Sequence, residues 1–267
     1  MSKVVENYYN QTVEIEWSRL DRHPIEFEIT KKHIDQFLLP KSRILDVGGG
    51  PGKYSFHYAA AGHQVTLFDL SPLNVAFAGK KQEEFGVKFE NLIVGNATSM
   101  TTVPDKTFDF IFCMGPLYHL TNERDRSKVL MECRRVLKDT GKVLFSFVTH
   151  MAQTISVIKR NMTNIGSWEP ALVQGIETGI NDTEFDTGFT EAYFMRPESI
   201  RDFVGKAGFS VLKIAGAEGL ACQSEERLMN LDRCSLEKWI DFLFRYSEDE
   251  SILGANQHVI CIAEKRF

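Results

Sequence analysis

Short apolar runs alternate with amphipathic stretches along most of the chain. An apolar run bounded by glycine or polar residues is typical of a buried strand, whereas apolar positions three or four residues apart are typical of a helix. The apolar runs predict strands at residues 44–47, 64–69, 89–94, 107–114, 142–148, 209–214 and 258–264. The amphipathic stretches predict helices at residues 24–38, 53–61, 72–85, 122–137, 150–162, 197–207 and, as one helix or two, 225–246.

This alternation predicts an α/β fold with a doubly wound, mostly parallel seven-stranded sheet and helices on both faces. Residues 107–114 are strongly apolar, as expected for a strand of a parallel sheet that is covered on both sides. The alternation lapses after residue 150. The strands at 209–214 and 258–264 are therefore expected at the sheet edge, in an arrangement that permits an antiparallel closing pair.

Breaks in the pattern divide the chain into four regions. Residues 1–40 are rich in charged and aromatic side chains and are expected to form an N-terminal helical arm or lid, although a surface leader fits equally well. Residues 41–150 form the regular core, 151–195 a cap-like insertion, and 196–267 the C-terminal part of the sheet with a helical excursion. The insertion is expected to supply a substrate pocket through its aromatic residues Trp168, Phe185, Phe189, Tyr193 and Phe194.

The charge balance narrows the range of partners. The 267 residues include 31 Lys and Arg against 36 Asp and Glu, a net charge of −5, and no segment is densely basic. Nucleic acid is therefore not expected as a partner, because phosphate contacts need clustered positive charge, and a small-molecule substrate fits better. With no apolar signal core and no apolar run of the ~20 residues that a membrane span needs, we expect a cytoplasmic protein without membrane contact. A monomer and a homodimer both remain possible.

The cysteines are odd in number and scattered singly. No C-x-x-C pair suggests a zinc or redox centre, so we expect mostly buried, reduced thiols and no metal. The five positions are Cys113, Cys133, Cys222, Cys234 and Cys261.

The candidate chemistry centres on the stretch Arg43–Lys53. A predicted strand runs directly into the glycines of Gly48–Gly52, where the backbone can turn tightly and approach a ligand without interference from Cβ atoms. The next strand ends on Asp69, and a carboxylate at that place suits a ribose diol. A dinucleotide site would have the pattern G-x-G-x-x-G, but Lys53 stands at the third glycine position, which disfavours NAD.

The segment Leu45–Gly52, Leu-Asp-Val-Gly-Gly-Gly-Pro-Gly, resembles the first motif of the class I S-adenosylmethionine-dependent methyltransferases. The Gly115–Leu120 loop and the segment Phe189–Phe194 resemble a bacterial, small-molecule-type branch of that family. The resemblance implies a Rossmann-like fold, methyltransferase activity, S-adenosyl-L-methionine as methyl donor and S-adenosyl-L-homocysteine as product. It covers about residues 40 to 150 and includes Asp69, Gly95–Ala97, Phe108–Ile111 and Arg135–Leu144.

The resemblance also implies a set of cofactor-binding residues. Asp69 would accept hydrogen bonds from both ribose hydroxyls, and Asp46 would serve the methionine end through water or backbone. Carbonyl groups near Gly48 and Gly115 would accept from the ammonium group. Asn96 departs from the family, where an aspartate often contacts adenine. The implied set is Asp46, Gly48, Gly49, Gly50, Asp69, Leu70, Asn96, Ala97, Met114 and Gly115.

Methyl transfer from a sulfonium is an in-line displacement, which needs alignment and, for a protonated acceptor, a base. Tyr118 and His119 follow the strand at 107–114 and are the candidate catalytic residues. His119 titrates near neutral pH, although it could equally be a histidine bonded to the backbone. His150 is a second candidate. Further side chains that could close over the cofactor are Tyr8, Tyr9, Trp17, Arg19, Arg22 and His23.

Three functions are compatible with the sequence. A methyltransferase acting on a small molecule is preferred, and the acidic balance disfavours one acting on RNA or protein. A non-catalytic cofactor-binding relative is the third, because a fold alone does not determine function. The sequence does not choose among O, N, S and C as the acceptor atom.

Overall fold

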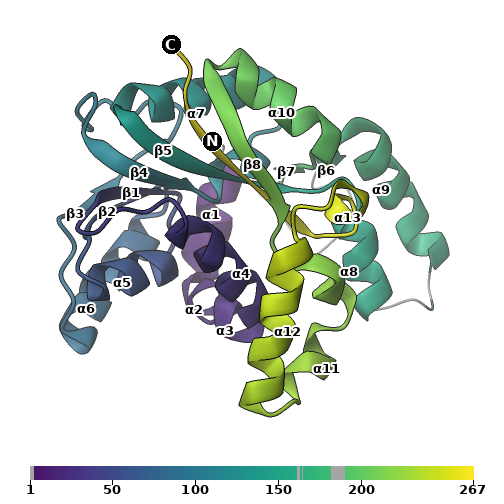
Figure 1. The fold of residues 1–267 in the computed structure, drawn as a ribbon. Coiled ribbons are helices and arrows are strands. Elements are labelled where there is room, and N and C mark those ends of the chain that lie inside the picture. The colour runs from purple at the N-terminus through teal and green to yellow at the C-terminus, as the bar shows by residue number, and fades with distance from the viewer. Residues whose placement is uncertain (1–2, 161–162, 164, 182–189) are drawn as a thin grey trace.

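The computed structural model describes residues 3–160, 163, 165–181 and 190–267. Its centre is a seven-stranded sheet with the strand order β3-β2-β1-β4-β5-β9-β8 (Figure 1). Strands β3, β2, β1, β4 and β5 run parallel, and β9 runs antiparallel to both β5 and β8. The predicted fold class is therefore confirmed. The antiparallel pairing that the sequence permits is present, with β8 at the edge of the sheet and β9 between β8 and β5. The strands are β1 (Arg43–Val47), β2 (Gln64–Asp69), β3 (Asn91–Val94), β4 (Phe108–Cys113), β5 (Leu137–Val148), β8 (Phe209–Gly216) and β9 (His258–Lys265).

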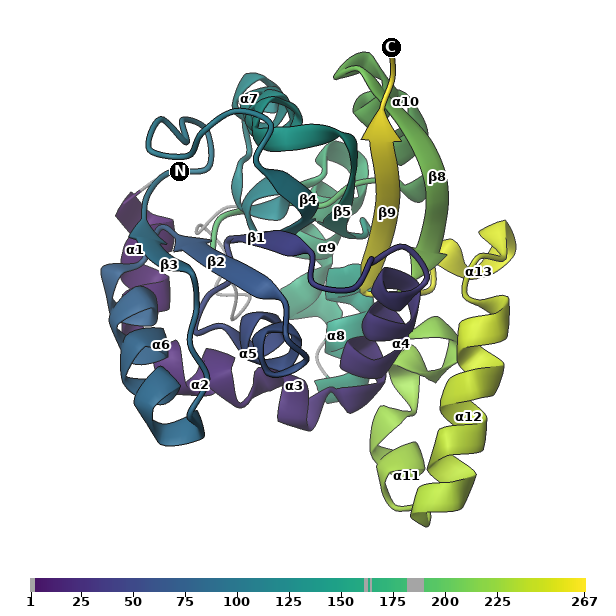
Figure 2. The same ribbon diagram turned by 60° about the vertical axis from the view of Figure 1, so that its left-hand side comes forward.

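Helices cover both faces of this sheet (Figure 2). Side chains of β4 alternate between the two layers: Ile111 packs in one hydrophobic cluster, and Phe110 and Phe112 pack in the other. Burial on both faces explains why this strand is apolar at nearly every position. One face carries α7 (Glu123–Val136) and α10 (Pro197–Lys206), and the other carries α4 (Pro24–Asp35), α5 (Lys53–Ala60) and α6 (Pro72–Phe85).

The remaining elements lie in the N-terminal region, the insertion and the C-terminal excursion. The N-terminal region is helical: α1 (Lys3–Gln11), α2 (Val13–Trp17) and α3 (Arg19–Arg22) precede α4. The insertion holds α8 (Ala152–Arg160), α9 (Ile165–Thr178) and a two-stranded sheet of β6 (Ile180–Asn181) and β7 (Ala192–Tyr193). The excursion holds η3 (Gly219–Gln223), α11 (Glu225–Met229), α12 (Arg233–Tyr246) and α13 (Glu250–Leu253).

The start of the fifth strand differs from the prediction. Strand β5 begins at Leu137 rather than at residue 142, because Leu137 already pairs with Phe108. The register then shifts, and the next pair is Phe110 with Lys142. The segment Asp139–Gly141, which lies between the predicted helix and the predicted strand, is therefore an irregularity inside a longer strand.

A buried histidine joins the sheet-covering helix α4 to the C-terminal excursion. His33 is fully buried, and its Nε2 lies 2.9 Å from the Ser247 hydroxyl. Ser247 donates its own proton to the Phe244 carbonyl, so Nε2–H of His33 must be the donor to Ser247. The Nδ1 atom has no partner. Burial, together with the charge of Lys213, lowers the pKa of His33 to about 3, and the imidazole is therefore neutral in the folded protein.

Two further predictions can be compared with the described residues. All five cysteines are free thiols, and only Cys234 is exposed. Within the described part of the chain, no helix has both the length and the apolar character needed to cross a membrane.

Candidate active site

A cavity lies at the edge of the sheet where the parallel strands end. The glycine loop after β1, Asp69 at the end of β2, and the segment after β4 line it, and α1 contributes residues from the N-terminal region. His258 lies at the same edge, because β9 runs antiparallel and therefore begins where the parallel strands end. The cavity brings together the following predicted residues: Asp46, Gly48, Gly49, Gly50, Asp69, Leu70, Ala97, Met114, Gly115, Tyr118 and His119.

The loop after β1 needs glycine for two separate reasons. Gly48 has a left-handed backbone with φ +71°, and a Cβ atom there would lie 2.6 Å from Cδ of Pro116. A Cβ atom on Gly49 would lie 2.7 Å from the Asp46 carboxyl group. The loop is fastened to β2, since Gly48 N–H donates to the Phe68 carbonyl at 2.7 Å. The backbone of the loop therefore faces the cavity without side chains in front of it.

The Asp69 carboxylate is held by three donors. Its Oδ2 accepts from the Gly50 N–H at 2.8 Å, and its Oδ1 accepts from the Ser71 N–H at 2.8 Å and from Nδ2 of Asn74 at 3.2 Å. Burial raises the pKa of Asp69, and these hydrogen bonds oppose the rise. A carboxylate has about four acceptor sites. Asp69 therefore keeps acceptor capacity toward the cavity that it lines.

Asp46 offers an unsatisfied acceptor to the same cavity. Its Oδ2 accepts from the Ser55 hydroxyl at 2.7 Å, while its Oδ1 is buried without a partner. Burial raises the pKa of Asp46 to about 7, despite the hydrogen bond from Ser55. A buried acceptor without a donor is costly and indicates a position for a bound polar group or water.

The two predicted catalytic residues lie side by side on η1 (Pro116–His119). The Tyr118 hydroxyl donates to the Met114 carbonyl at 3.0 Å. Nδ1 of His119 lies 3.2 Å from the Glu191 carbonyl and donates to it, so Nε2 accepts from the Tyr9 hydroxyl at 2.5 Å. Burial lowers the pKa of His119 to about 4. Protein groups therefore engage the polar atoms of both side chains in this conformation.

Replacing Tyr9 with phenylalanine should loosen the docking of α1 over the cavity. The variant loses one hydrogen bond to His119, worth about 1 kcal/mol, and hydrogen exchange of the α1 amides should accelerate about fivefold. The control is Tyr246→Phe, which changes a half-exposed tyrosine on α12. Equal exchange of α1 in both variants and the wild type would show that the Tyr9 hydroxyl does not hold this helix.

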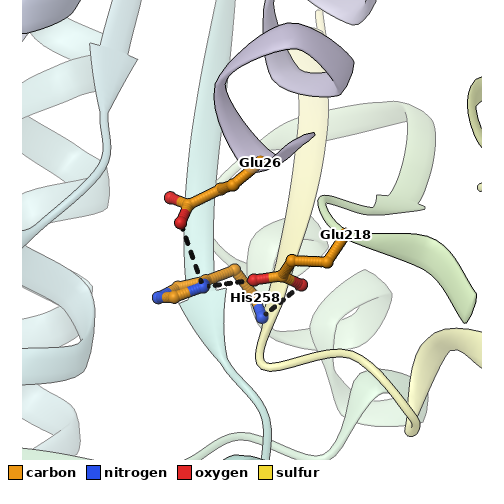
Figure 3. A group of neighbouring side chains, drawn as sticks. All are labelled: Glu26, Glu218 and His258. Carbon is orange, nitrogen blue, oxygen red and sulfur yellow. Dashed lines mark hydrogen bonds and ion pairs between the residues drawn. The ribbon is translucent and has the colours of Figure 1, made fainter. Parts of the chain in front are cut away.

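Beyond the glycine loop, the cavity has a charged wall formed by Arg19, Glu26 and His258, which no local sequence pattern groups together. Arg19 donates from Nη1 and Nη2 to the two carboxylate oxygens of Glu26, at 2.7 and 2.9 Å. Nδ1 of His258 donates to Glu218 at 2.6 Å and lies 3.7 Å from Glu26 (Figure 3). Burial opposes ionisation of Glu26, but the charges of Arg19 and His258 prevail and lower its pKa to about 2.

Several predicted residues lie away from the cavity. Asn96 does not line it, and the Asn96 side-chain oxygen accepts from the backbone N–H and the hydroxyl of Thr98. His150 and the described aromatic residues of the insertion, Trp168 among them, do not line it either. Phe185 and Phe189 lie outside the described residues. Of the N-terminal candidates, Tyr9 and Arg19 line the cavity, whereas Tyr8, Trp17, Arg22 and His23 do not.

The sequence is similar to known methyltransferases over the part of the chain that lines the glycine-loop side of the cavity. Residues 45–145 match the family model described as "Methyltransferase domain". The ubiquinone biosynthesis O-methyltransferase of Xanthomonas euvesicatoria pv. vesicatoria is 31% identical over 124 residues, which are 46% of this chain and 49% of that protein. The protein of the same description from Pseudomonas putida (strain W619) is 34% identical over 110 residues, 41% of this chain and 46% of that one. The chain thus spans about half the length of the curated relatives it matches.

Solved structures resemble the chain over most of its length. A S-adenosylmethionine-dependent methyltransferase from Clostridium acetobutylicum superposes with a TM-score of 0.60 and 14% identity, covering 97% of this chain and 99% of that one. A S-adenosylmethionine-dependent methyltransferase from Methanosarcina mazei gives 0.59 and 20%, covering 88% and 97%. At these identities the likeness shows the fold alone.

Residues 45–145 match a methyltransferase domain, and the sheet order and the glycine loop agree with the fold of the class I S-adenosylmethionine-dependent methyltransferases. The matched domain lies within the region that the motif resemblance covered. The resemblance inferred from the sequence is therefore confirmed, and S-adenosylmethionine is the cofactor of the class.

Proposed function

We propose that this protein transfers the methyl group of S-adenosylmethionine to a hydroxyl group of a small molecule. The observation that carries the proposal is the continuity of the cavity, which joins the glycine loop to the wall formed by Arg19, Glu26 and His258. The curated relatives described as O-methyltransferases support oxygen as the acceptor atom. The acidic balance of the chain supports a small molecule over RNA.

The cofactor half of the cavity has groups that fit S-adenosylmethionine. We assign the free acceptor capacity of Asp69 to the ribose hydroxyls and the unpartnered Oδ1 of Asp46 to the methionine end, directly or through water. The glycine backbone gives the cofactor room, since a Cβ atom at Gly49 would displace the Asp46 carboxyl group. Leu70, Ala97 and Met114 are the proposed walls around adenine.

The half of the cavity beside Arg19, Glu26 and His258 is proposed to hold and orient the acceptor. When bound, S-adenosylmethionine supplies a methyl group on a cationic sulfur, whose departure as a neutral thioether needs no metal or acid. The chain must then align the acceptor and remove its proton. Arg19 and Glu26 form a fixed ion pair beside the cavity, and α1 contributes Tyr9 above it. We expect these groups to orient the acceptor.

The first test measures binding and turnover separately. Calorimetry with S-adenosylmethionine should give one site per chain. Release of S-adenosylhomocysteine should then depend on a hydroxyl compound, with catechol, 3,4-dihydroxybenzoate and an aliphatic alcohol as first acceptors. Binding without release from any hydroxyl compound would contradict the proposal and favour a non-catalytic relative. Release driven by RNA or by a protein acceptor would favour the other alternative.

Tyr118 and His119 are proposed to line the path of the methyl group. Their assignment as catalytic residues stays a prediction, which Tyr118→Phe and His119→Ala test directly. A loss of turnover in His119→Ala at unchanged affinity for S-adenosylmethionine would support a catalytic role. Full turnover in both variants would place the base elsewhere. The cytoplasmic location and the choice between monomer and homodimer also stay predictions.

A further inference from the structure

The Glu218 carboxylate holds His258 through two hydrogen bonds, one to its ring and one to its backbone. Glu218 accepts from Nδ1 of His258 at 2.6 Å and from the His258 backbone N–H at 3.1 Å. The backbone of Glu218 is held between two strands. Glu218 comes just after β8, and its backbone N–H donates at 3.2 Å to the side chain of Asn256, which comes just before β9. Both the position and the rotation of the imidazole are therefore restrained.

The other edge of the imidazole is left for a ligand. Figure 3 shows Nδ1 turned toward both carboxylates and Nε2 turned away from them. Among the described residues, Nε2 has no hydrogen-bond partner, and His258 lines the cavity. Because Nδ1 faces carboxylates, it carries the proton in the neutral ring, and Nε2 then presents a lone pair. This is the tautomer that a general base requires.

The charged groups around His258 determine how it titrates. Glu218 follows β8, Glu26 comes from α4, Arg19 from α3, and the Tyr118 ring from η1 lies 6.4 Å away. Burial opposes protonation of His258, but the two carboxylates outweigh it and raise the pKa above the ordinary value. Arg19 and a protonated His258 together balance the charges of Glu26 and Glu218, so this cluster can be neutral without a bound cation.

We propose that His258 is the general base of methyl transfer and that Glu218 is its positioning residue, an inference that rests on the proposed O-methyltransferase function. Nε2 of His258 takes the proton of the acceptor hydroxyl. The acceptor oxygen forms its bond to the methyl carbon as the bond from that carbon to sulfur breaks, and the sulfur leaves as a neutral thioether. The proton then passes from the imidazolium to solvent, and the enzyme returns to its starting state.

The decisive variant is His258→Asn. An asparagine amide keeps a donor near the position of Nδ1 and can still contact Glu218, but it has no basic atom at the position of Nε2. Since a general base contributes about 10²- to 10⁴-fold, we expect kcat to fall by at least about 100-fold with affinity for S-adenosylmethionine unchanged. The matched control is His57→Asn, because His57 is an exposed histidine on α5 that does not line the cavity. It should keep wild-type turnover.

The pH dependence separates a base from a structural histidine. In the wild type, kcat/KM should rise with pH through a midpoint above ~6.5, the ordinary value for histidine, and this rise should be missing in His258→Asn. Glu218→Gln should move the midpoint to lower pH, because it removes a negative charge that stabilises the imidazolium. NMR titration of the His258 ring in the protein without cofactor should give a pKa above the ordinary value in the wild type and a lower pKa in Glu218→Gln.

Three results would overturn the assignment of the base: wild-type kcat in His258→Asn, a His258 ring that titrates at or below its ordinary pKa, or turnover that EDTA abolishes and Mg²⁺ restores. Dependence on Mg²⁺ would instead assign a bound cation to Glu26, Glu218 and His258, whose ligand atoms lie within 4.8 Å of one another. If the wild type binds S-adenosylmethionine but methylates no hydroxyl compound, the proposed function fails and the base assignment fails with it. An active wild type with an equally active variant rejects the base alone.

Discussion

Replacing Asp69 with alanine is expected to weaken binding of S-adenosylmethionine by about 1–3 kcal/mol, or about 5- to 150-fold in the dissociation constant. The proposed contacts are hydrogen bonds from the ribose hydroxyls to a buried carboxylate. Asp69 is buried, and its oxygens already receive three protein donors, which fix the direction of the remaining acceptor site. Calorimetry of both proteins with S-adenosylmethionine measures the change.

The same carboxylate holds the loop, so the binding loss needs a matched control. Asp109 also accepts from a backbone N–H, that of Arg43 at 2.9 Å, but it lies at the start of β4, away from the cavity. Asp109→Ala should lower the thermal stability without changing the affinity. If Asp69→Ala binds S-adenosylmethionine as tightly as the wild type, or if both variants lose affinity equally, the ribose assignment is wrong.

The stability of the protein should fall steeply on acidification because of His33. The folded protein holds this histidine neutral, with a pKa of about 3, whereas the unfolded chain protonates it near the ordinary value of ~6.5. Between these values the unfolded state binds one proton more than the native state. The contribution of the neutral His33 to the free energy of unfolding is therefore complete above pH ~6.5. Below that pH it is lost at about 1.4 kcal/mol per pH unit.

The measurement compares urea unfolding of the wild type and of His33→Gln at pH 7, 5.5 and 4.5. Glutamine keeps a donor for Ser247 and does not titrate, so the variant should show a shallower loss of unfolding free energy across this range. Other groups with shifted pKa values, Glu26 and Asp46 among them, act in both proteins and cancel in the difference. Equal slopes in the two proteins would exclude His33 as the acid-sensitive group.

Much of the fold was predictable because it depends on local patterns. The alternation of apolar runs and amphipathic stretches gave the seven strands of the sheet, and the glycine spacing after Val47 gave the loop that lines the cavity. The start of β5 was not predictable in this way. A polar Asp139–Gly141 segment has the composition of a turn, and only the pairing of Leu137 with Phe108 extends the strand through it.

Local sequence patterns could not predict the charged wall, because its residues are far apart in the chain. Glu26 and His258 come from opposite ends of the chain and meet only because β9 turns back through the sheet. Glu218, which does not line the cavity but holds His258 from outside it, comes from a third region. The contact of Tyr9 with His119 likewise joins residues 110 positions apart. One signal was available: a histidine that begins an antiparallel last strand lies at the edge where the parallel strands end.

The place of β9 between β5 and β8 also sets an order of events during synthesis. A nascent chain that has reached α12 already contains the glycine loop and every parallel strand, but β5 and β8 still lack the partner that lies between them. Unpaired strand edges of this kind attract other chains. The cavity wall that His258 and Ile260 supply is therefore completed last, and the edges of β5 and β8 that face each other stay unpaired until residues 258–265 have been made.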